Sequence, residues 1–310
     1  MARALLSDCT KADQRTAAFV RLNKYSMLGS VLGPCVGGLL AEPNLRLPEG
    51  LRMGIFDRFP FLLPCACCCM LAVATFLVVC VYAEDPRKES PLLGSATAPA
   101  HPLSQLRANS AFLSAVFTWS LCAYTGSMFV ELLGLWCKTA IDSGGLGWRE
   151  EWKVSVVLVT GSIALILFLS TALRPLITRY GTSTVLRLSL FLVMLDFLLV
   201  PLISSLPSAL VWPCILLASP LWCLASGSCI TSINIIINSV VPQELYGAAN
   251  GLGISLVALI RAFGPVTAGA LLGWSIAEAR PYPMDRCLPF YVAAAVTAAN
   301  LVFLRRSNLV

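Results

Sequence analysis

Eight long apolar stretches run through this chain, and each is long enough to cross a lipid bilayer as a helix. A hydrocarbon core about 30 Å thick needs roughly 20 apolar residues per helix. The stretches lie near residues 19–41, 60–83, 109–137, 152–173, 185–206, 209–241, 248–275 and 287–304. Only 12% of the residues are charged, about half the share that is usual in soluble domains. The sequence therefore predicts an all-α polytopic membrane protein with about eight transmembrane helices.

The loops between these stretches predict the orientation of the chain. More of the 22 Lys and Arg residues lie in one set of alternate loops than in the other. Cytoplasmic loops are enriched in these residues, so both termini are expected on the cytoplasmic side. The net charge of +6 is explained by this topology, and no nucleic-acid partner is expected. The sequence does not choose between a plasma and a vacuolar membrane.

A glycine–proline signature occurs twice, once in the first stretch and once in the seventh. Glycines four residues apart lie on one helix face and let another helix approach closely, and the proline bends the helix by removing a backbone hydrogen bond. Such a helix could act as a pivot and seal between two halves of a carrier, or it could simply pack tightly. The residues are Gly29, Gly33, Pro34, Gly37 and Gly38 in the first copy, and Gly264 and Pro265 in the second.

The spacing of the two copies predicts the domain organisation. The second copy comes six stretches after the first, as in transporters built from two parallel repeats of six helices. Residues 1–83 would then hold the last two helices of an N-terminal half, and residues 109–310 a complete six-helix C-terminal half. The polar, Pro-rich segment 84–108 between them is interpreted as a cytoplasmic linker. Four further helices are expected before residue 1.

Several motifs resemble a known transporter family. Residues 29–38 resemble the antiporter motif in the fifth helix of drug–proton antiporters of the major facilitator superfamily. Residues 56–64 (Phe-Asp-Arg-Phe-Pro-Phe-Leu-Leu-Pro) resemble the start of the sixth helix in its zinc-induced-facilitator-like branch, and residues 144–147, 247–251 and 261–265 fit the same branch. The resemblance implies a partial major-facilitator fold and the exchange of small organic solutes, chelates or drugs for protons.

Apart from residues near their ends, the apolar stretches contain three charged residues: Glu131, Arg261 and Asp196. A charge in the hydrocarbon region costs several kcal/mol unless it is paired or hydrated, so each is a candidate functional residue. The resemblance places a carboxylate and a cation at Glu131 and Arg261. They could serve proton coupling or substrate contact, or they could form a static ion pair that fixes helix packing. Asp196 lies in a helix that corresponds to a peripheral, lipid-facing helix of the superfamily, and the sequence does not explain it.

Polar and aromatic side chains mark a candidate substrate path. Asn234 and Asn238 share a helix face because they are four residues apart, and they could line a path or form hydrogen bonds between helices. Tyr124 and Trp136 could offer stacking surfaces to a substrate. Packing, or a place in the interfacial aromatic belt, is the more ordinary explanation for both aromatic residues.

Other functional classes are disfavoured. The sequence has no Gly-x4-Gly-Lys-Ser/Thr loop for ATP, no convergent catalytic set of an enzyme, and one histidine, His101, in a loop. No metal site and no cofactor are predicted. The four thiols of residues 65–69 cannot converge on one metal ion, because successive helix positions turn by about 100°. A secondary transporter is favoured, with the lipid bilayer, a small-molecule substrate and protons as partners. The alternative is a non-transporting remnant or regulatory form that associates with a full-length relative.

Overall fold

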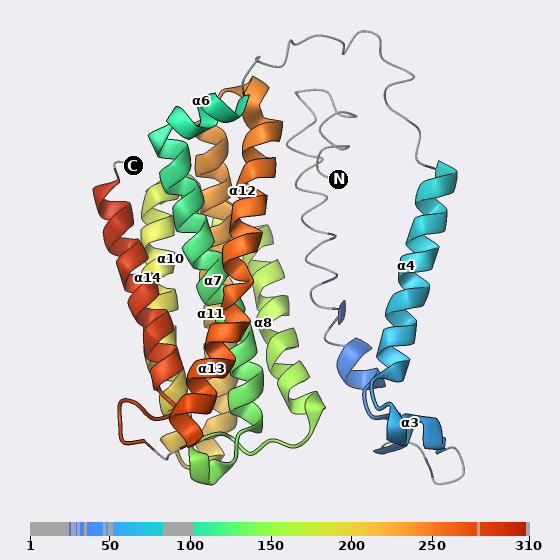
Figure 1. Ribbon diagram of the computed structural model, residues 1–310. Helices are drawn as coiled ribbons and strands as arrows, with labels where there is room; N and C mark the ends of the chain where they lie inside the picture. Colours follow the sequence, from blue (N-terminus) through green and yellow to red (C-terminus); the bar gives the residue numbers. More distant parts are fainter. Residues whose placement is uncertain are drawn as a thin grey trace. The chain divides into compact units, whose positions relative to one another are not determined.

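The computed structural model describes residues 52–82, 102–277 and 280–307, together with scattered positions between 25 and 48. Every regular element among these residues is helical (Figure 1). Seven segments of the described chain are long and apolar enough to cross a membrane, and they match the predicted stretches from 60–83 onward. The prediction of an all-α polytopic membrane protein is confirmed, while the first stretch, 19–41, lies largely outside the described residues.

The chain divides into two compact units, residues 1–95 with 150–159, and residues 96–149 with 160–310. The elements of the first unit are η1 (Pro43–Leu45), α3 (Gly54–Arg58) and α4 (Leu62–Tyr82). Asn44 joins η1 to α3, because its Nδ2 donates to Met53 O at 2.9 Å and to Asp57 Oδ1 at 2.7 Å. The helix α4 is apolar on all sides, and none of its residues is buried, so its whole surface is available to lipid or to other helices.

The second unit is a helical bundle that contains the six remaining spans (Figure 1). The first residues of one of its helices, α8, belong to the first unit. The elements are α6 (Pro102–Ala108), α7 (Ser110–Lys138), η4 (Ile141–Ser143), α8 (Glu151–Thr171), α9 (Leu173–Tyr180), α10 (Thr182–Leu199), η5 (Val200–Ser205), α11 (Ser208–Ser239), η6 (Gln243–Leu245), α12 (Tyr246–Arg261), α13 (Phe263–Ala277) and α14 (Leu288–Arg306).

Helix α7 is central to the second unit. It packs against α11, α12, α13 and α14, and α10 in turn packs against α11 and α14. Its buried side chains run along most of its length, from Phe112 through Trp119 and Phe129 to Trp136. A helix that is covered on several sides does not need to confine its apolar residues to one stripe, which explains why α7 shows little amphipathic pattern.

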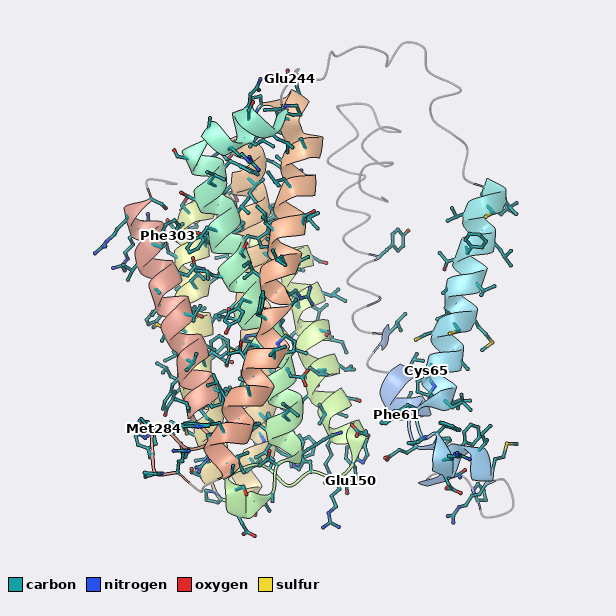
Figure 2. The ribbon with its side chains drawn as sticks, viewed as in Figure 1. Phe61, Cys65, Glu150, Glu244, Met284 and Phe303 are labelled. Carbon is teal, nitrogen blue, oxygen red and sulfur yellow. The ribbon has the colours of Figure 1, made fainter. Side chains whose placement is uncertain are left out.

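A single side chain fixes the start of α7. Asn109 Oδ1 accepts a hydrogen bond from the Phe112 N–H at 3.0 Å, which caps the helix, and its Nδ2 donates to Val240 O at 2.8 Å. The beginning of α7 is thereby tied to the end of α11. Figure 2 shows Glu244 at this end of the unit and Met284 at the opposite end.

The segment predicted as a linker contributes in part to the second unit. Residues 102–108 form α6, and Leu106 is only 1% exposed in a cluster that includes Phe112 and Leu245. An apolar side chain gains by leaving water, so the end of this segment folds onto the bundle. Residues 83–101 of the chain lie outside the described residues.

Candidate functional site

Helices α7 and α13 approach each other closely at Gly264, in the second glycine–proline signature. A Cβ atom placed on Gly264 would collide with Ser127 Oγ, and it would lie 2.8 Å from Tyr124 O and 2.9 Å from Met128 N. Real Cβ atoms essentially never approach other atoms within 3.0 Å. Only glycine fits this crossing, so the signature brings two helix backbones together here.

Pro265 interrupts the predicted span 248–275, which forms two helices, α12 and α13, instead of one. Because proline has no N–H, the carbonyl of Arg261, four residues earlier, loses its partner within the helix. The Ser127 hydroxyl lies 2.9 Å from that carbonyl oxygen and 3.0 Å from Tyr124 O. A hydroxyl from a neighbouring helix commonly satisfies such a freed carbonyl in membranes. The helix break is thus stabilised by α7.

Glu131 and Arg261 lie beside this break. Glu131 follows Ser127 by one helical turn on α7, and Arg261 is the last residue of α12, near the middle of the span Tyr246–Ala277. Both side chains are exposed. In the described part of the chain no ion pair joins them, so the static pair that the sequence left open is not formed in this conformation.

The surface formed by Glu131, Ser127 and Arg261 is here named the charged face. Its two ionisable side chains are not covered by other helices of the second unit. Contact of such groups with lipid in mid-span would cost several kcal/mol each. The charged face therefore requires water, a solute or other protein against it.

The two asparagines of α11 differ in their surroundings. Asn238 Oδ1 accepts a hydrogen bond from Asn250 Nδ2 at 3.2 Å, and the same Nδ2 donates to Tyr246 O at 2.8 Å. Asn238 therefore joins α11 to α12. Asn234 is half-buried one turn earlier, and within the described residues its amide makes no hydrogen bond, which leaves it free to contact a solute.

The two aromatic residues of the candidate path are placed differently. Trp136 is fully buried, its Nε1 donates to Gly144 O at 3.1 Å, and its ring meets Phe290 edge-on at 5.9 Å. Such an indole has no free face for a substrate, so its position corresponds to the packing role. Tyr124 is half-buried on α7, close to the crossing at Gly264.

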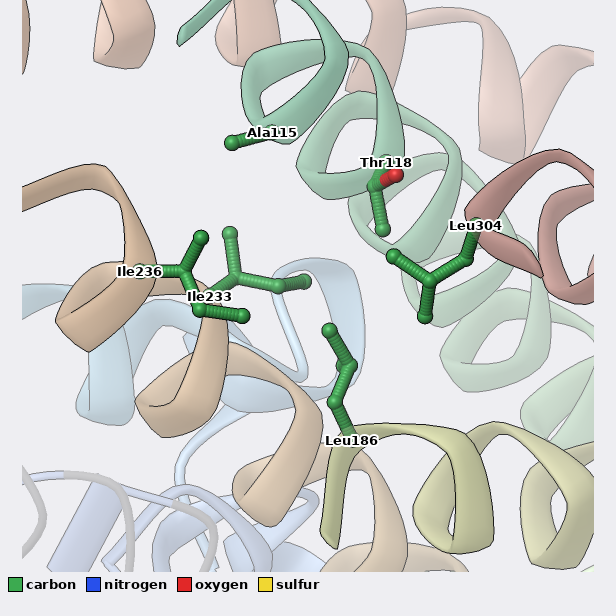
Figure 3. A pocket seen from close by; sticks show the side chains of 6 residues that line it. All are labelled: Ala115, Thr118, Leu186, Ile233, Ile236 and Leu304. Atoms are coloured by element: carbon green, nitrogen blue, oxygen red, sulfur yellow. The ribbon is translucent and has the colours of Figure 1, made fainter. Parts of the chain in front are cut away.

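A small crevice lies between α7, α10, α11 and α14 inside the second unit (Figure 3). The Thr118 hydroxyl is its only polar side-chain group, and the crevice has no room for a water molecule. A solute therefore does not bind there in this conformation. The lining residues are Ala115, Thr118, Leu186, Ile233, Ile236 and Leu304.

The first glycine–proline signature lies in the first unit. A Cβ on Gly38 would collide with the Ser155 side chain of α8, which belongs to the same unit. Gly29, Gly33 and Gly37 have nothing within 4 Å of a Cβ position. Pro34 lies outside the described residues. Of the first copy, Gly38 thus shows a close helix approach.

Asp196 was not explained by the sequence, and the structure places it in the interior. Its side chain is 2% exposed, on a helix that packs against both α11 and α14. Its Oδ2 is buried without a hydrogen-bond partner among the described residues. The expectation that its helix faces lipid therefore does not apply to this residue. Helix assignment alone could not show which way the side chain points.

Arg286, which the sequence did not single out, joins its loop to the end of η5, near Met284. Its Nε donates to Ser204 Oγ at 3.0 Å, and its Nη2 donates to Ser205 Oγ at 2.6 Å. Burial, together with the Asp285 carboxylate, raises the pKa of the Cys287 thiol to about 11. A loop arginine gives no signal in the sequence, because its partners lie about 80 residues away.

Comparison with known proteins is consistent with this fold. The sequence model of the Major Facilitator Superfamily matches residues 1–265. Protein ZINC INDUCED FACILITATOR-LIKE 1 from Arabidopsis thaliana is 27% identical, over 80% of this chain and 55% of its own length. Protein ZINC INDUCED FACILITATOR 1 from the same plant is 25% identical, over 88% and 61%. Efflux pump azaK from Aspergillus niger is 23% identical, over 85% and 55%.

The chain belongs to the Major Facilitator Superfamily. It is an integral, multi-pass membrane protein of a transporter family, not of an enzyme family. The resemblance to the zinc-induced-facilitator-like branch, inferred from short motifs, is confirmed by these relatives. The chain spans between 55% and 61% of the length of the three relatives.

Proposed function

We propose that the protein containing this chain is a secondary transporter that exchanges small organic solutes, chelates or drugs for protons by rocking alternating access. The observation that carries the proposal is the charged face. Glu131 and Arg261 lie within membrane spans, exposed and unpaired with each other, beside a broken helix. Ionisable residues in such positions mark proton and substrate pathways in membrane proteins.

The two charged residues have complementary roles in this proposal. Glu131 binds a proton when the charged face is open to one side of the membrane and releases it on the other side. Arg261 holds an anionic group of the solute, or neutralises Glu131 when that residue is ionised. The N-terminus of α13 begins two residues after Arg261, and its partial positive charge favours the same anionic group.

The remaining features support parts of this cycle. Asn234 and Tyr124 line the proposed path, and the crossing at Gly264 and Pro265 provides the pivot. The related proteins are named as an efflux pump and as zinc-induced facilitators, which supports transport of small solutes without identifying one. The proposal includes a cytoplasmic position for both termini, in either the plasma or the vacuolar membrane.

The proposal is tested by uptake into proteoliposomes under an imposed pH gradient. The probes are labelled citrate, a small anionic chelate, and ethidium, a drug-like cation. Glu131→Gln should abolish uptake driven by the gradient but retain exchange without a gradient, because glutamine resembles protonated glutamate. The matched control is Glu244→Gln, which changes an exposed carboxylate at the end of the bundle. Gradient-driven uptake that survives in Glu131→Gln would contradict the role of Glu131.

A second candidate is association with a full-length relative. One observation favours it: α4 is apolar on all sides with none of its residues buried. Differently tagged copies of the chain and of the relative should then be purified together from membranes. Recovery of the chain alone would exclude this candidate.

A further inference from the structure

The carboxyl group of Asp196 is buried, unlike the exposed side chains of Glu131 and Arg261 on the charged face. Asp196 is the fifteenth residue of α10, within the span Thr182–Ser205. Its side chain is 2% exposed, and Oδ2 is buried with no hydrogen-bond partner in the described part of the chain. Neither the function proposed above nor the packing of the core requires a carboxyl group at this position.

The groups that face Asp196 carry no compensating charge. Cys223 on α11 lies close enough to be influenced by the Asp196 charge, and it forms a hydrogen bond with Ser219. No ion pair involves Asp196 among the described residues, and η5 has no ionisable side chain. None of the other ionisable residues of α10 and of the helices packed against it forms an ion pair with Asp196 among the described residues: Arg174, Arg179, Tyr180, Arg187, Cys214, Cys229, Tyr291, Arg305 and Arg306.

An aromatic wall separates Asp196 from the charged face. The neighbouring Phe197 meets Phe129 edge-on at 5.6 Å, and Phe129 stacks on Trp222 at 4.3 Å. Phe129 and Glu131 are two residues apart on α7, which places them about 200° apart around the helix. Glu131 and the Phe129–Phe197 contact therefore lie on opposite sides of α7. Asp196 is 2% exposed, so water does not reach it in this conformation.

Helix α11 contains a proline, Pro220, close to the part that faces Asp196. A Cβ on Gly161 of α8 would lie 2.6 Å from Cys223 Sγ and 2.8 Å from Ser219 Oγ, so α8 comes very close to this part of α11. Pro220 lies inside α11 between these two residues, and a proline in a helix removes one hydrogen bond and permits a bend. A bend of α11 at Pro220 would move the part of α11 that carries Cys223, which lies beside Asp196.

An ionised carboxylate with these neighbours would be buried and unpaired, at a cost of several kcal/mol. We propose that Asp196 is a second proton-binding site of the protein, separate from Glu131. In this conformation Asp196 is a neutral carboxylic acid. When α11 bends and admits water, the acid transfers its proton to water and becomes a carboxylate, and it regains a proton on closure. The ligand is a proton and not a metal ion, because the described residues contain no cluster of three metal-ligating side chains.

The role of this site in transport rests on the proposed proton coupling, but its protonation is measured without transport. Infrared spectra of the purified protein in lipid nanodiscs distinguish the C=O stretch of a carboxylic acid from a carboxylate band. At pH 7 the wild type should show an acid band that is absent in Asp196→Asn. The band should remain in Glu131→Gln and in Asp142→Asn, the matched control that removes an exposed aspartate. It should convert reversibly to a carboxylate band at alkaline pH.

The inference fails if the acid band is unchanged in Asp196→Asn, or if it does not convert at any pH at which the protein stays folded. Labelling the wild type with 13C-aspartate provides a second measurement that needs no variant: the acid band should shift, and an unshifted band would overturn the assignment. If the acid band is present but the protein transports neither citrate nor ethidium, the proposed transport of those solutes is contradicted. The protonation of Asp196 is still supported in that case.

Discussion

Glu131 and Asp196 are both acidic residues within membrane spans of the second unit, yet their surroundings are opposite. Glu131 is exposed on the charged face, one turn from the hydroxyl that bonds the Arg261 carbonyl. Asp196 is 2% exposed and has an oxygen with no partner in the described structure. Two acidic residues within spans of the same unit thus differ completely in their access to solvent.

The difference shows that the position around a helix, and not the position along it, decides what a carboxyl group can do. Phe129 and Glu131 are close in sequence but lie on opposite sides of α7. One side belongs to the aromatic wall and the other to the charged face. The carboxyl group on the open side is exposed, whereas the one behind the aromatic wall is buried.

The largest effect is expected at the crossing that positions the charged face. Gly264→Ala places a Cβ against Ser127 and the α7 backbone, and overpacking of this kind typically costs about 1–3 kcal/mol. The thermal midpoint of the purified protein should fall, and gradient-driven uptake should fall with it. The matched control is Gly273→Ala on the same helix, where nothing lies within 4 Å of the new Cβ. Equal midpoints for the two variants would contradict the close crossing.

A smaller effect is expected from Ser127→Ala, which removes the hydroxyl that lies 2.9 Å from Arg261 O. Interhelical hydrogen bonds in membranes contribute about 0.6 kcal/mol on average and at most about 1.7, so the thermal midpoint should fall modestly. Ser255→Ala is the control, because that hydroxyl is exposed and bonds only its own helix. If both variants behave alike, the hydroxyl does not stabilise the break at Ala262.

The smallest effect is expected for the alkylation of Cys287, a buried thiol outside the spans. Because burial raises the pKa of Cys287 to about 11, its reactive thiolate form is scarce below that pH. Alkylation of Cys287, followed by peptide mass spectrometry, should be slow at pH 7 to 9 and accelerate only as the pH approaches 11. Asp285→Asn should advance this rise to lower pH, because it removes a neighbouring negative charge. Rapid alkylation at pH 7 would show that the loop is open.

Features that depend on local composition were predictable from the sequence. The long apolar runs gave spans that agree with the described helices from α4 to α14, because a bilayer imposes its length requirement on each helix separately. The close packing at Gly264 was expected from the glycine–proline signature. The break at Ala262 follows from the missing N–H of Pro265, although the apolar run 248–275 by itself predicts one span.

Features that depend on partners distant in the sequence were not predictable. The direction of the Asp196 side chain is set by α11 and α14, which pack against α10. The serine partners of Arg286 lie in η5, and the burial of Trp136 depends on Phe290 and on the loop carbonyl of Gly144. A single sequence contains no information on such contacts except through residue type.

The most direct test of the account compares water access at the two carboxyl positions. Glu131→Cys and Asp196→Cys are each treated with a membrane-impermeant maleimide in proteoliposomes opened to both sides, and the added label is counted by mass spectrometry against the wild type. We expect one additional label per chain at position 131 and none at position 196. Equal labelling at the two positions, or labelling at 196 alone, would contradict the division between an open charged face and a buried proton site.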